Sequence, residues 1–326
     1  MEDVLQALRA AAESTRLRLL VLLAGTELTV SEITQVLNQS QPRVSRHLKL
    51  LGEAGLLSRV REGAWVFYRT ADEGNGGRVA QLLAGLVDPA DPDLAQDRER
   101  MEQVRRARAQ TAADYFARNA EAWAHLRALH VPEAEVEAAI LELAGPSPLE
   151  TVLDLGTGTG RILEILAPCT RRGIGIDQSH EMLAIARANL ERAGFSHCHA
   201  RHGDLFNLPF TANPKGGVDL AVLHQVLHYL DDPAAAVREA SRVLAPQGRI
   251  LIADFAPHDL EFLRTEHAHR RLGFSDREVA QWASAAGFEV SRRIELPPTG
   301  GEGKLTVVVW QLSRPKASLT ARGAAA

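Results

Sequence analysis

The feature that most constrains the fold of this chain is an apolar run that leads directly into a turn of three alternating glycines. The segment is residues 152–160, VLDLGTGTG, and a helical pattern follows over residues 161–167. Glycine tolerates positive φ and lets a ligand approach the backbone closely, while the first turn of the next helix has free N–H groups. A strand, a glycine turn and a helix in this order are typical of nucleotide-like cofactor sites in doubly wound α/β sheets.

Two acidic residues stand where the next two strands of such a sheet would end. Asp177 closes the apolar run over residues 173–177. It comes about 20 residues after the glycine turn, where these folds hydrogen-bond ribose hydroxyls. Asp204 follows a third strand that begins near His197. The carboxyl ends of parallel strands line the crevice in which such sheets bind ligands, so both acids are expected in the cofactor site.

The order Asp-x-Gly-x-Gly-x-Gly, Gly-x-Asp, Gly-Asp-Leu and the run VDLAVL at residues 218–223 resembles class I S-adenosylmethionine-dependent methyltransferases. The resemblance spans residues 111–311 and implies S-adenosylmethionine or S-adenosylhomocysteine as cofactor. It implies that Asp177 binds the ribose diol and that Asp204 and Leu205 lie at the adenine edge. Met182 and Leu183 would pack on the adenine face. The implied cofactor-binding residues are Tyr115, Asp154, Gly156, Thr157, Gly158, Gly160, Asp177, Gln178, Met182, Gly203, Asp204, Leu205 and His224.

The same resemblance implies a Rossmann-like sheet of five parallel strands with a closing hairpin. Residues 289–296 and 304–311 are strand-like and are joined by the glycine-rich segment 297–303, which predicts a hairpin with one antiparallel strand at the sheet edge. Residues 114–123 resemble the helical lid of quinone-biosynthesis methyltransferases. The alternative is an amphipathic helix that buries Tyr115 and its aromatic neighbours.

Histidines follow the fourth and fifth strands, where the resemblance places the methyl acceptor. We assign no catalytic residue there, and the candidates for the acceptor pocket are His224, His228, Tyr229 and His258, with His267 and His269 as further wall residues. His224 and His228 are four residues apart, a spacing that can bind metal on a helix. Because they follow a strand, we interpret them as pocket residues and expect no metal site.

Residues 1–88 precede the predicted α/β sheet and are expected to form a separate domain. Apolar residues recur at helical spacing over residues 5–23, and residues 29–37 and 41–54 predict two short helices joined by a polar turn. Ser40 is the expected N-cap of the second helix. Two strands around residues 61–63 predict a wing, so this part is expected to be an α+β winged helix-turn-helix domain whose second helix enters the major groove.

Residues 40–70 carry six basic residues against two acids, although the whole chain has a net charge of −4. The strings ESTRLRLL at 13–20 and SQPRVSRHLKLL at 40–51 resemble the ArsR family of winged-helix repressors. The resemblance implies a homodimer that binds operator DNA. The resemblance and the local positive charge together give the DNA-binding candidates, which are Ser40, Gln41, Arg43, Ser45, Arg46, Lys49, Arg59 and Arg61.

One departure from that family concerns metal sensing. Metal-sensing members carry cysteines in the helix before the recognition helix, and this chain has Thr29 and Ser31 there. Hydroxyls do not replace thiolates for soft metals, so we expect no thiolate sensor at that position. The chain has only two cysteines, Cys169 and Cys198, which predicts no disulfide framework and fits a reducing cytoplasm.

The expected domains are a DNA-binding domain over residues 1–88, a linker and solvated connecting helix over 89–110, a methyltransferase domain over 111–313 and a disordered tail over 314–326. No apolar run approaches the length of a membrane span, so no membrane partner is expected. This organisation predicts a dimeric transcriptional regulator whose second domain binds S-adenosylmethionine or S-adenosylhomocysteine as effector. The alternative is an active methyltransferase that acts on a small molecule and regulates its own pathway.

Overall fold

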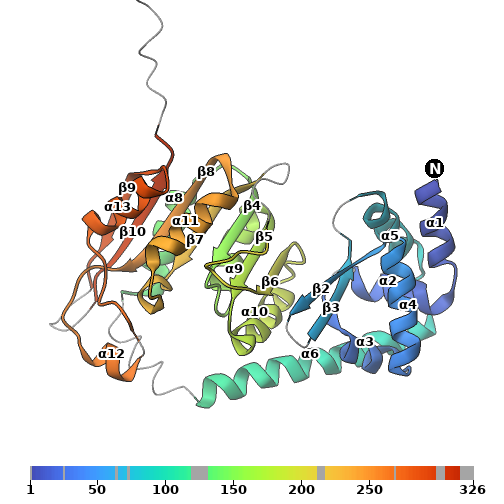
Figure 1. The fold of residues 1–326 in the computed structure, drawn as a ribbon. Coiled ribbons are helices and arrows are strands. Elements are labelled where there is room, and N and C mark those ends of the chain that lie inside the picture. Colours follow the sequence, from blue (N-terminus) through green and yellow to red (C-terminus); the bar gives the residue numbers. More distant parts are fainter. Residues whose placement is uncertain are drawn as a thin grey trace, which may run out of the picture. The chain divides into compact units, whose positions relative to one another are not determined.

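The computed structural model describes residues 2–24, 26–62, 65–71, 74–118, 131–210, 217–267, 269–298 and 305–315. The chain divides into two compact units, Met1–Ala113 and Asp114–Ala326, which we call the first and the second unit. Figure 1 shows helices around a small sheet in the first unit and a large central sheet flanked by helices in the second. No helix among the described residues is long and apolar enough to cross a membrane.

The first unit is a winged helix-turn-helix domain, as predicted. Its three-stranded sheet is antiparallel, with the order β1-β3-β2. Its elements are α1 Glu2–Ala11, α2 Ser14–Leu23, β1 Leu28–Thr29, α3 Val30–Leu37, α4 Gln41–Glu53, β2 Leu57–Glu62, β3 Trp65–Thr70, α5 Gly74–Leu86 and α6 Pro92–Arg118. The turn between α3 and α4 is tight because Asn38 adopts a left-handed conformation with φ of 50°.

Helix caps set the boundaries at the start of the first unit. The apolar pattern over residues 5–23 is divided into two helices because Glu13 is the N-cap of α2 and its carboxylate accepts the Arg16 N–H at 3.0 Å. Helix α3 begins with a capping box: Thr29 Oγ1 accepts the Glu32 N–H, and the Glu32 carboxylate accepts the Thr29 N–H at 2.7 Å.

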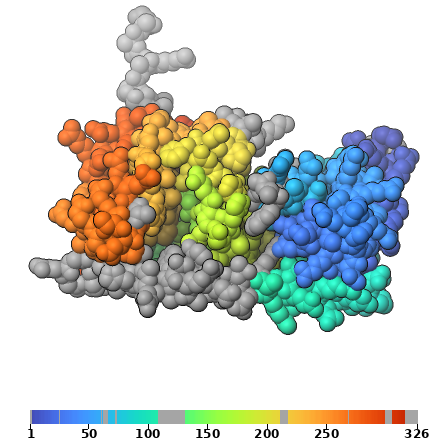
Figure 2. Space-filling model, turned by 60° about the horizontal axis from the view of Figure 1, so that its bottom comes forward, coloured from blue at the N-terminus to red at the C-terminus, as the bar shows by residue number. Residues whose placement is uncertain are grey.

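Helix α6 corrects the expectation of a solvated connecting helix. Its side chains Leu94, Met101 and Val104 are buried, and the last two belong to the apolar core of the first unit. Asp97 on the same helix is also buried and accepts two hydrogen bonds of 2.7 Å from Arg18. In Figure 2 the green-blue surface of α6 lies directly against the blue first unit. Leu94, Met101 and Val104 form a narrow apolar stripe among the many charged residues of α6, so the sequence pattern alone suggested a solvated helix.

The second unit is built on a seven-stranded sheet with the order β6-β5-β4-β7-β8-β10-β9. The strands are β4 Leu149–Leu155, β5 Thr170–Asp177, β6 Cys198–His202, β7 Val218–His224, β8 Leu244–Phe255, β9 Glu289–Leu296 and β10 Val307–Ser313. The first five are parallel, and β10 is antiparallel to both of its neighbours. This confirms the predicted methyltransferase-like α/β fold.

The expected position of the antiparallel strand was wrong. Strand β10 lies inside the sheet, between β8 and β9, and β9 forms the edge. The physical reason is composition: residues 307–310 of β10 are each at most 1% exposed, whereas most of β9 is exposed and carries Arg292, Arg293 and Glu295. The strand with the larger apolar surface gains more from burial and takes the interior place.

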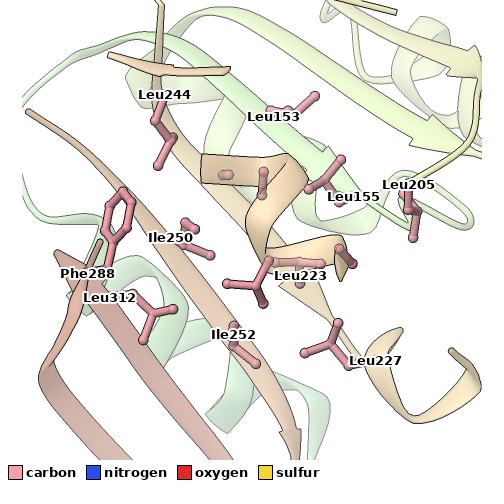
Figure 3. Close-up of a cluster of buried hydrophobic side chains, with 14 of the residues drawn as sticks. Leu153, Leu155, Leu205, Leu223, Leu227, Leu244, Ile250, Ile252, Phe288 and Leu312 are labelled. Carbon is pink, nitrogen blue, oxygen red and sulfur yellow. The ribbon is translucent and has the colours of Figure 1, made fainter. Parts of the chain in front are cut away.

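Helices cover both faces of this sheet. They are α8 Glu133–Ala144, α9 Arg161–Leu166, α10 His180–Arg192, α11 Pro233–Val243, α12 Phe262–Glu266 and α13 Asp276–Ala285, with short 3-10 helices η1 Ala167–Cys169 and η2 Leu227–Tyr229. Alternate residues of the strands enter two apolar clusters. Leu153 and Leu155 pack under α11 and α13 (Figure 3), and Val152 packs on α8 and α9. The order of the strands reverses at β4, where doubly wound sheets open their ligand crevice.

Several predicted features lie outside the described residues. They are the tip of the wing at 63–64, residues 119–123 of the expected lid, residues 299–303 of the hairpin connection and the tail from 316 onward. Residues 114–118 are described as the end of α6, and the side chain of Tyr115 lies outside the described part of the chain.

Candidate functional site

The glycine turn joins β4 to α9 at the point where the strand order reverses. Gly156, Gly158 and Gly160 have φ values of 76°, 51° and 82°, which favour glycine. The N–H groups of Gly156 and Thr157 both donate to the Ile176 carbonyl, at 2.8 and 3.0 Å, and so fix the turn against β5. A Cβ at Gly156 would overlap Val226, whereas a Cβ at Gly158 would meet no atom within 4 Å. The backbone at Gly158 is therefore open to a ligand.

Asp177 is held at the end of β5 by backbone donors. One carboxylate oxygen accepts the Gly158 N–H at 2.9 Å, and the other accepts the Ser179 N–H at 2.8 Å. The half-buried carboxylate thus lies directly beside the open part of the glycine turn. This is the position that the sequence predicted for the acid that binds the ribose diol.

Asp204, at the end of β6, lies beside Gln178. Its exposed carboxylate accepts the Phe206 N–H at 2.9 Å and the Gln178 amide at 3.3 Å. The Gly203 N–H donates to the Asp177 carbonyl at 3.0 Å, so these predicted residues form one edge of the candidate site. Met182 is half-buried on α10.

Two of the implied adenine contacts are core residues. Leu205 is 5% exposed and belongs to the apolar cluster of Figure 3, and Leu183 is fully buried against Ala186 and Ala200. Their side chains stabilise the fold, and only the backbone of Leu205 remains as a candidate contact for the adenine edge.

Asp154 is a buried acid with an unused oxygen. It lies at the end of β4, is 1% exposed, and accepts the Thr157 hydroxyl at 2.6 Å. Its second oxygen, Oδ1, is buried without a hydrogen-bond partner. Burial raises the pKa of Asp154 to about 7, against the opposing effect of the Thr157 hydrogen bond and with a further rise from the charge of Asp177. A positively charged ligand group would satisfy this oxygen.

The raised pKa of Asp154 predicts a pH dependence of stability. The folded protein holds this proton more tightly than the unfolded chain, whose pKa is near 3.8. The free energy of unfolding should therefore fall as the pH rises from about 4 to about 7, by on the order of 4 kcal/mol, and then level off. Urea denaturation of wild type and Asp154→Asn across this range measures it. A difference between the two proteins that does not change with pH would contradict the assignment.

The predicted acceptor residues gather at the carboxyl ends of β7 and β8. His224 ends β7 and is half-buried, and burial lowers its pKa to about 4. His228, in η2, is 2% exposed, and its Nδ1 lies 2.8 Å from Asp254. Gln225 between them has a φ of 49°, so the two histidines do not share a helix. No group of metal-binding side chains occurs among the residues that the structure describes.

Asp254 was missed at the sequence level. It is fully buried near the end of β8 and accepts hydrogen bonds from His228 and from the N–H groups of Leu227 and Phe255. The signal was present: Asp254 is a single acid inside the apolar run over residues 249–255. A buried charge that cannot reach solvent requires such partners.

The other predicted histidines divide into two groups. His269 is 4% exposed and its ring centroid lies 4.2 Å from that of His228, while His258 packs against Phe255. His267 instead packs against Phe262, with 6.1 Å between the ring centroids. Tyr229 is 43% exposed beside the ring of His228.

Helix α4 presents the predicted DNA-binding residues on one side. Val44, Leu48 and Leu51 are buried in the domain core. Ser40, Gln41, Arg43, Arg46 and Lys49 are exposed, and Ser45 is half-buried. Arg59 and Arg61, on the wing strand β2, are exposed as well. The helix-turn-helix thus places its cations opposite its apolar face, as contact with a phosphate backbone requires.

Comparison with known proteins identifies the first unit. Residues 13–59 match the family model "Bacterial regulatory protein, arsR family". The arsenic resistance transcriptional regulator ArsR1 of Pseudomonas putida is 42% identical over 94 residues, which cover 28% of this chain and 73% of that protein. The arsenical resistance operon repressor of Escherichia coli is 46% identical over 87 residues, 26% of this chain and 70% of that protein. This chain belongs to the ArsR family.

The ArsR-family chain also carries a methyltransferase domain, since residues 146–289 match the family model of that name. An arsenite methyltransferase of Aquipseudomonas alcaligenes is 33% identical over 168 residues, 43% of this chain and 49% of that protein. The chain spans about half the length of the curated relatives that match it first.

Proposed function

We propose that this ArsR-family protein is a dimeric DNA-binding regulator whose methyltransferase domain binds S-adenosylmethionine or S-adenosylhomocysteine as effector. The observation that carries the proposal is the glycine turn at the switch point of the sheet. Its open residue, Gly158, donates to Asp177, and the buried Asp154 lies at the end of the strand that leads into the turn. A nucleoside with two ribose hydroxyls and a cationic amino-acid tail matches these acceptors.

The surface of the first unit supports dimerisation. Five of the nine large apolar side chains that are exposed in the described part belong to α1 and α5, two helices that pack on each other. They are Val4, Leu5, Leu8, Leu82 and Leu86. Leu82 and Leu86 are 69% and 80% exposed, and a group of exposed apolar side chains on adjoining helices is typical of a protein–protein interaction site. A second copy would cover this surface by two-fold symmetry.

Dimerisation has a direct test. The double substitution Leu82→Glu and Leu86→Glu should give a monomer and lower operator affinity by roughly 100-fold or more, because only one half-site is then bound at a time. Light scattering after size exclusion and binding to labelled operator measure both effects. Leu141→Glu, at another exposed leucine on α8, is the matched control. A double variant that remains a dimer would place the interface elsewhere.

Helix α6 offers a route between the two functions. Asp97 accepts a hydrogen bond from Arg18 and forms an ion pair with Arg100. Arg18 also donates to the Leu37 carbonyl, and Arg100 donates to the Val36 carbonyl at 3.2 Å. Both carbonyls belong to the last turn of α3, the first helix of the helix-turn-helix. The same helix α6 continues to Arg118, beyond the start of the second unit. A shift of α6 on ligand binding would thus act on α3.

Fluorescence anisotropy on an operator selected from random duplex DNA tests the proposal. One cofactor form, which we take to be S-adenosylhomocysteine, should change operator affinity by about 5- to 150-fold. Asp97→Asn should reduce this factor towards one, whereas Glu102→Gln, at an exposed acid of the same helix, should leave it unchanged. A wild-type protein whose operator affinity responds to neither cofactor form would contradict the effector role.

The histidines at the ends of β7 and β8 favour a second candidate function, methyl transfer to a small molecule. Methyl transfer requires mainly alignment of the acceptor and exclusion of water. Arsenite is a poor fit as acceptor, because soft arsenic requires thiolates. Cys198 is buried, and burial raises its pKa to about 12, which leaves only the half-buried Cys169. Formation of S-adenosylhomocysteine in the presence of an acceptor would demonstrate the activity.

A further inference from the structure

His228, His258 and His269, together with Asp254, form what we call the histidine cluster. Asp254 is fully buried and accepts two backbone N–H groups, from Leu227 at 3.1 Å and from Phe255 at 2.8 Å. Its carboxylate is therefore an acceptor, and the 2.8 Å contact with His228 places the proton on Nδ1 of that ring. Nε2 is the remaining ring nitrogen of His228.

The other two rings have nitrogens without partners. Nδ1 of His269, a residue 4% exposed, is buried and makes no hydrogen bond. His258 accepts the Leu260 N–H at Nδ1, so the proton of its neutral ring is on Nε2, which is also buried and unpartnered. Burial lowers the pKa of His269 to about 3 and lowers that of His258, so both rings are neutral at physiological pH. Buried polar atoms are rarely left in this state unless a ligand or water meets them.

The unpaired atoms define the ligand group. His258 offers an N–H donor that needs an acceptor. The unprotonated nitrogen of a neutral His269 ring can accept a hydrogen bond. An ammonium group supplies donors only and would leave His258 unsatisfied. A carboxylate supplies acceptors only and would lie near the buried charge of Asp254. A hydroxyl group supplies both functions and carries no charge.

The surroundings define the rest of the ligand. Phe255 lies 5.9 Å from the ring of His269, with only 14° between the planes, and 6.1 Å from the ring of His258. Tyr229 lies 4.2 Å from His228 and remains partly exposed. Phe255 is fully buried, so the partly exposed ring of Tyr229 is the surface here that suits an aromatic ring. The cluster also adjoins the cofactor turn, because Val226, two residues before His228, packs directly over Gly156.

We propose that the histidine cluster binds an uncharged aromatic acceptor that carries a hydroxyl group, a neutral phenol. The proposal rests on the second candidate function given above, methyl transfer to a small molecule. The hydroxyl lies among the imidazole nitrogens of His228, His258 and His269, and the aromatic ring packs on Tyr229. Asp254 is a positioning residue that fixes the ring of His228.

The test uses the full chain labelled with 15N-histidine and two probes that differ only at the oxygen. 2-Naphthol keeps the hydroxyl, and 2-methoxynaphthalene lacks its proton. Titration with 2-naphthol should shift the imidazole 15N signals of the histidine cluster. The affinity for the ether should be lower than that for 2-naphthol by a factor of about ten or more. His269→Phe keeps a ring but removes the nitrogens, so it should lower the affinity for 2-naphthol to that for the ether.

Controls make the outcomes distinct. His197 lies just before β6, on the other side of β5 from the cluster, and its ring makes a hydrogen bond with the Ala167 carbonyl. His197→Phe should therefore leave 2-naphthol binding unchanged. If His269→Phe fails to fold, His258→Phe makes the same comparison. Equal affinity of wild type for the two probes, or shifts confined to histidines outside the cluster, would overturn the proposal. Calorimetry with S-adenosylhomocysteine on the same preparation separates this result from a failure of the cofactor assignment.

Discussion

Replacing Arg43 and Arg46 together by alanine should abolish the preference of the protein for its operator over random DNA. Both side chains are exposed on α4, the helix whose buried face is fixed by Val44 and Leu48. A bidentate arginine contact with a base edge contributes about 1–3 kcal/mol of discrimination, and a dimer loses four such arginines. The specific affinity should therefore fall by several orders of magnitude, to the level of non-specific binding. Anisotropy with operator and scrambled duplexes at one fixed salt concentration measures this.

The wing provides the matched control for this experiment. Arg61 is exposed on β2, outside the recognition helix, so Arg61→Ala should weaken binding to operator and random DNA by a similar factor. It should also reduce the dependence of affinity on salt. If the double variant Arg43→Ala and Arg46→Ala lost the same factor on both duplexes, then α4 would not be the element that reads the sequence.

Asp177→Ala should weaken the binding of S-adenosylmethionine and S-adenosylhomocysteine by about 1–3 kcal/mol, or roughly 5- to 150-fold. The carboxylate is oriented by the N–H groups of Gly158 and Ser179 and lies at the predicted ribose position. Isothermal calorimetry measures the change. Glu150→Ala, at an exposed acid at the end of β4 opposite the glycine turn, should bind both ligands as wild type does. Wild-type affinity in Asp177→Ala would remove Asp177 from the cofactor site.

The features predicted correctly from the sequence are those encoded by neighbouring residues. The glycine turn at 156–160 needs only local steric rules, and the helix-turn-helix needs only apolar spacing and a short polar turn. The exposed face of α4 follows directly from the burial of every third or fourth residue. The family resemblances rested on the same local strings, and the family models match these regions.

The features that could not be predicted from the sequence depend on contacts between distant segments. The bond between His228 and Asp254 joins residues 26 positions apart, and Arg18 and Asp97 are 79 positions apart. Neither pair has a local signature. The interior place of β10 also depends on which of the two hairpin strands pairs with β8, a contact between segments that are distant in the sequence. Leu183 and Leu205 were expected at the adenine because the methyltransferase resemblance implied it, although their side chains lie in the core.

We propose that ligand binding in the methyltransferase domain and operator binding in the ArsR-family domain are coupled. Linkage requires that operator DNA change the affinity for the ligand by the same factor as the ligand changes the affinity for operator. Calorimetric titration of S-adenosylhomocysteine into the free protein and into the protein–operator complex measures this directly. We expect dissociation constants that differ by about 5- to 150-fold and that match the factor from anisotropy. Equal constants in the two titrations would show that the domains act independently and would contradict the effector role.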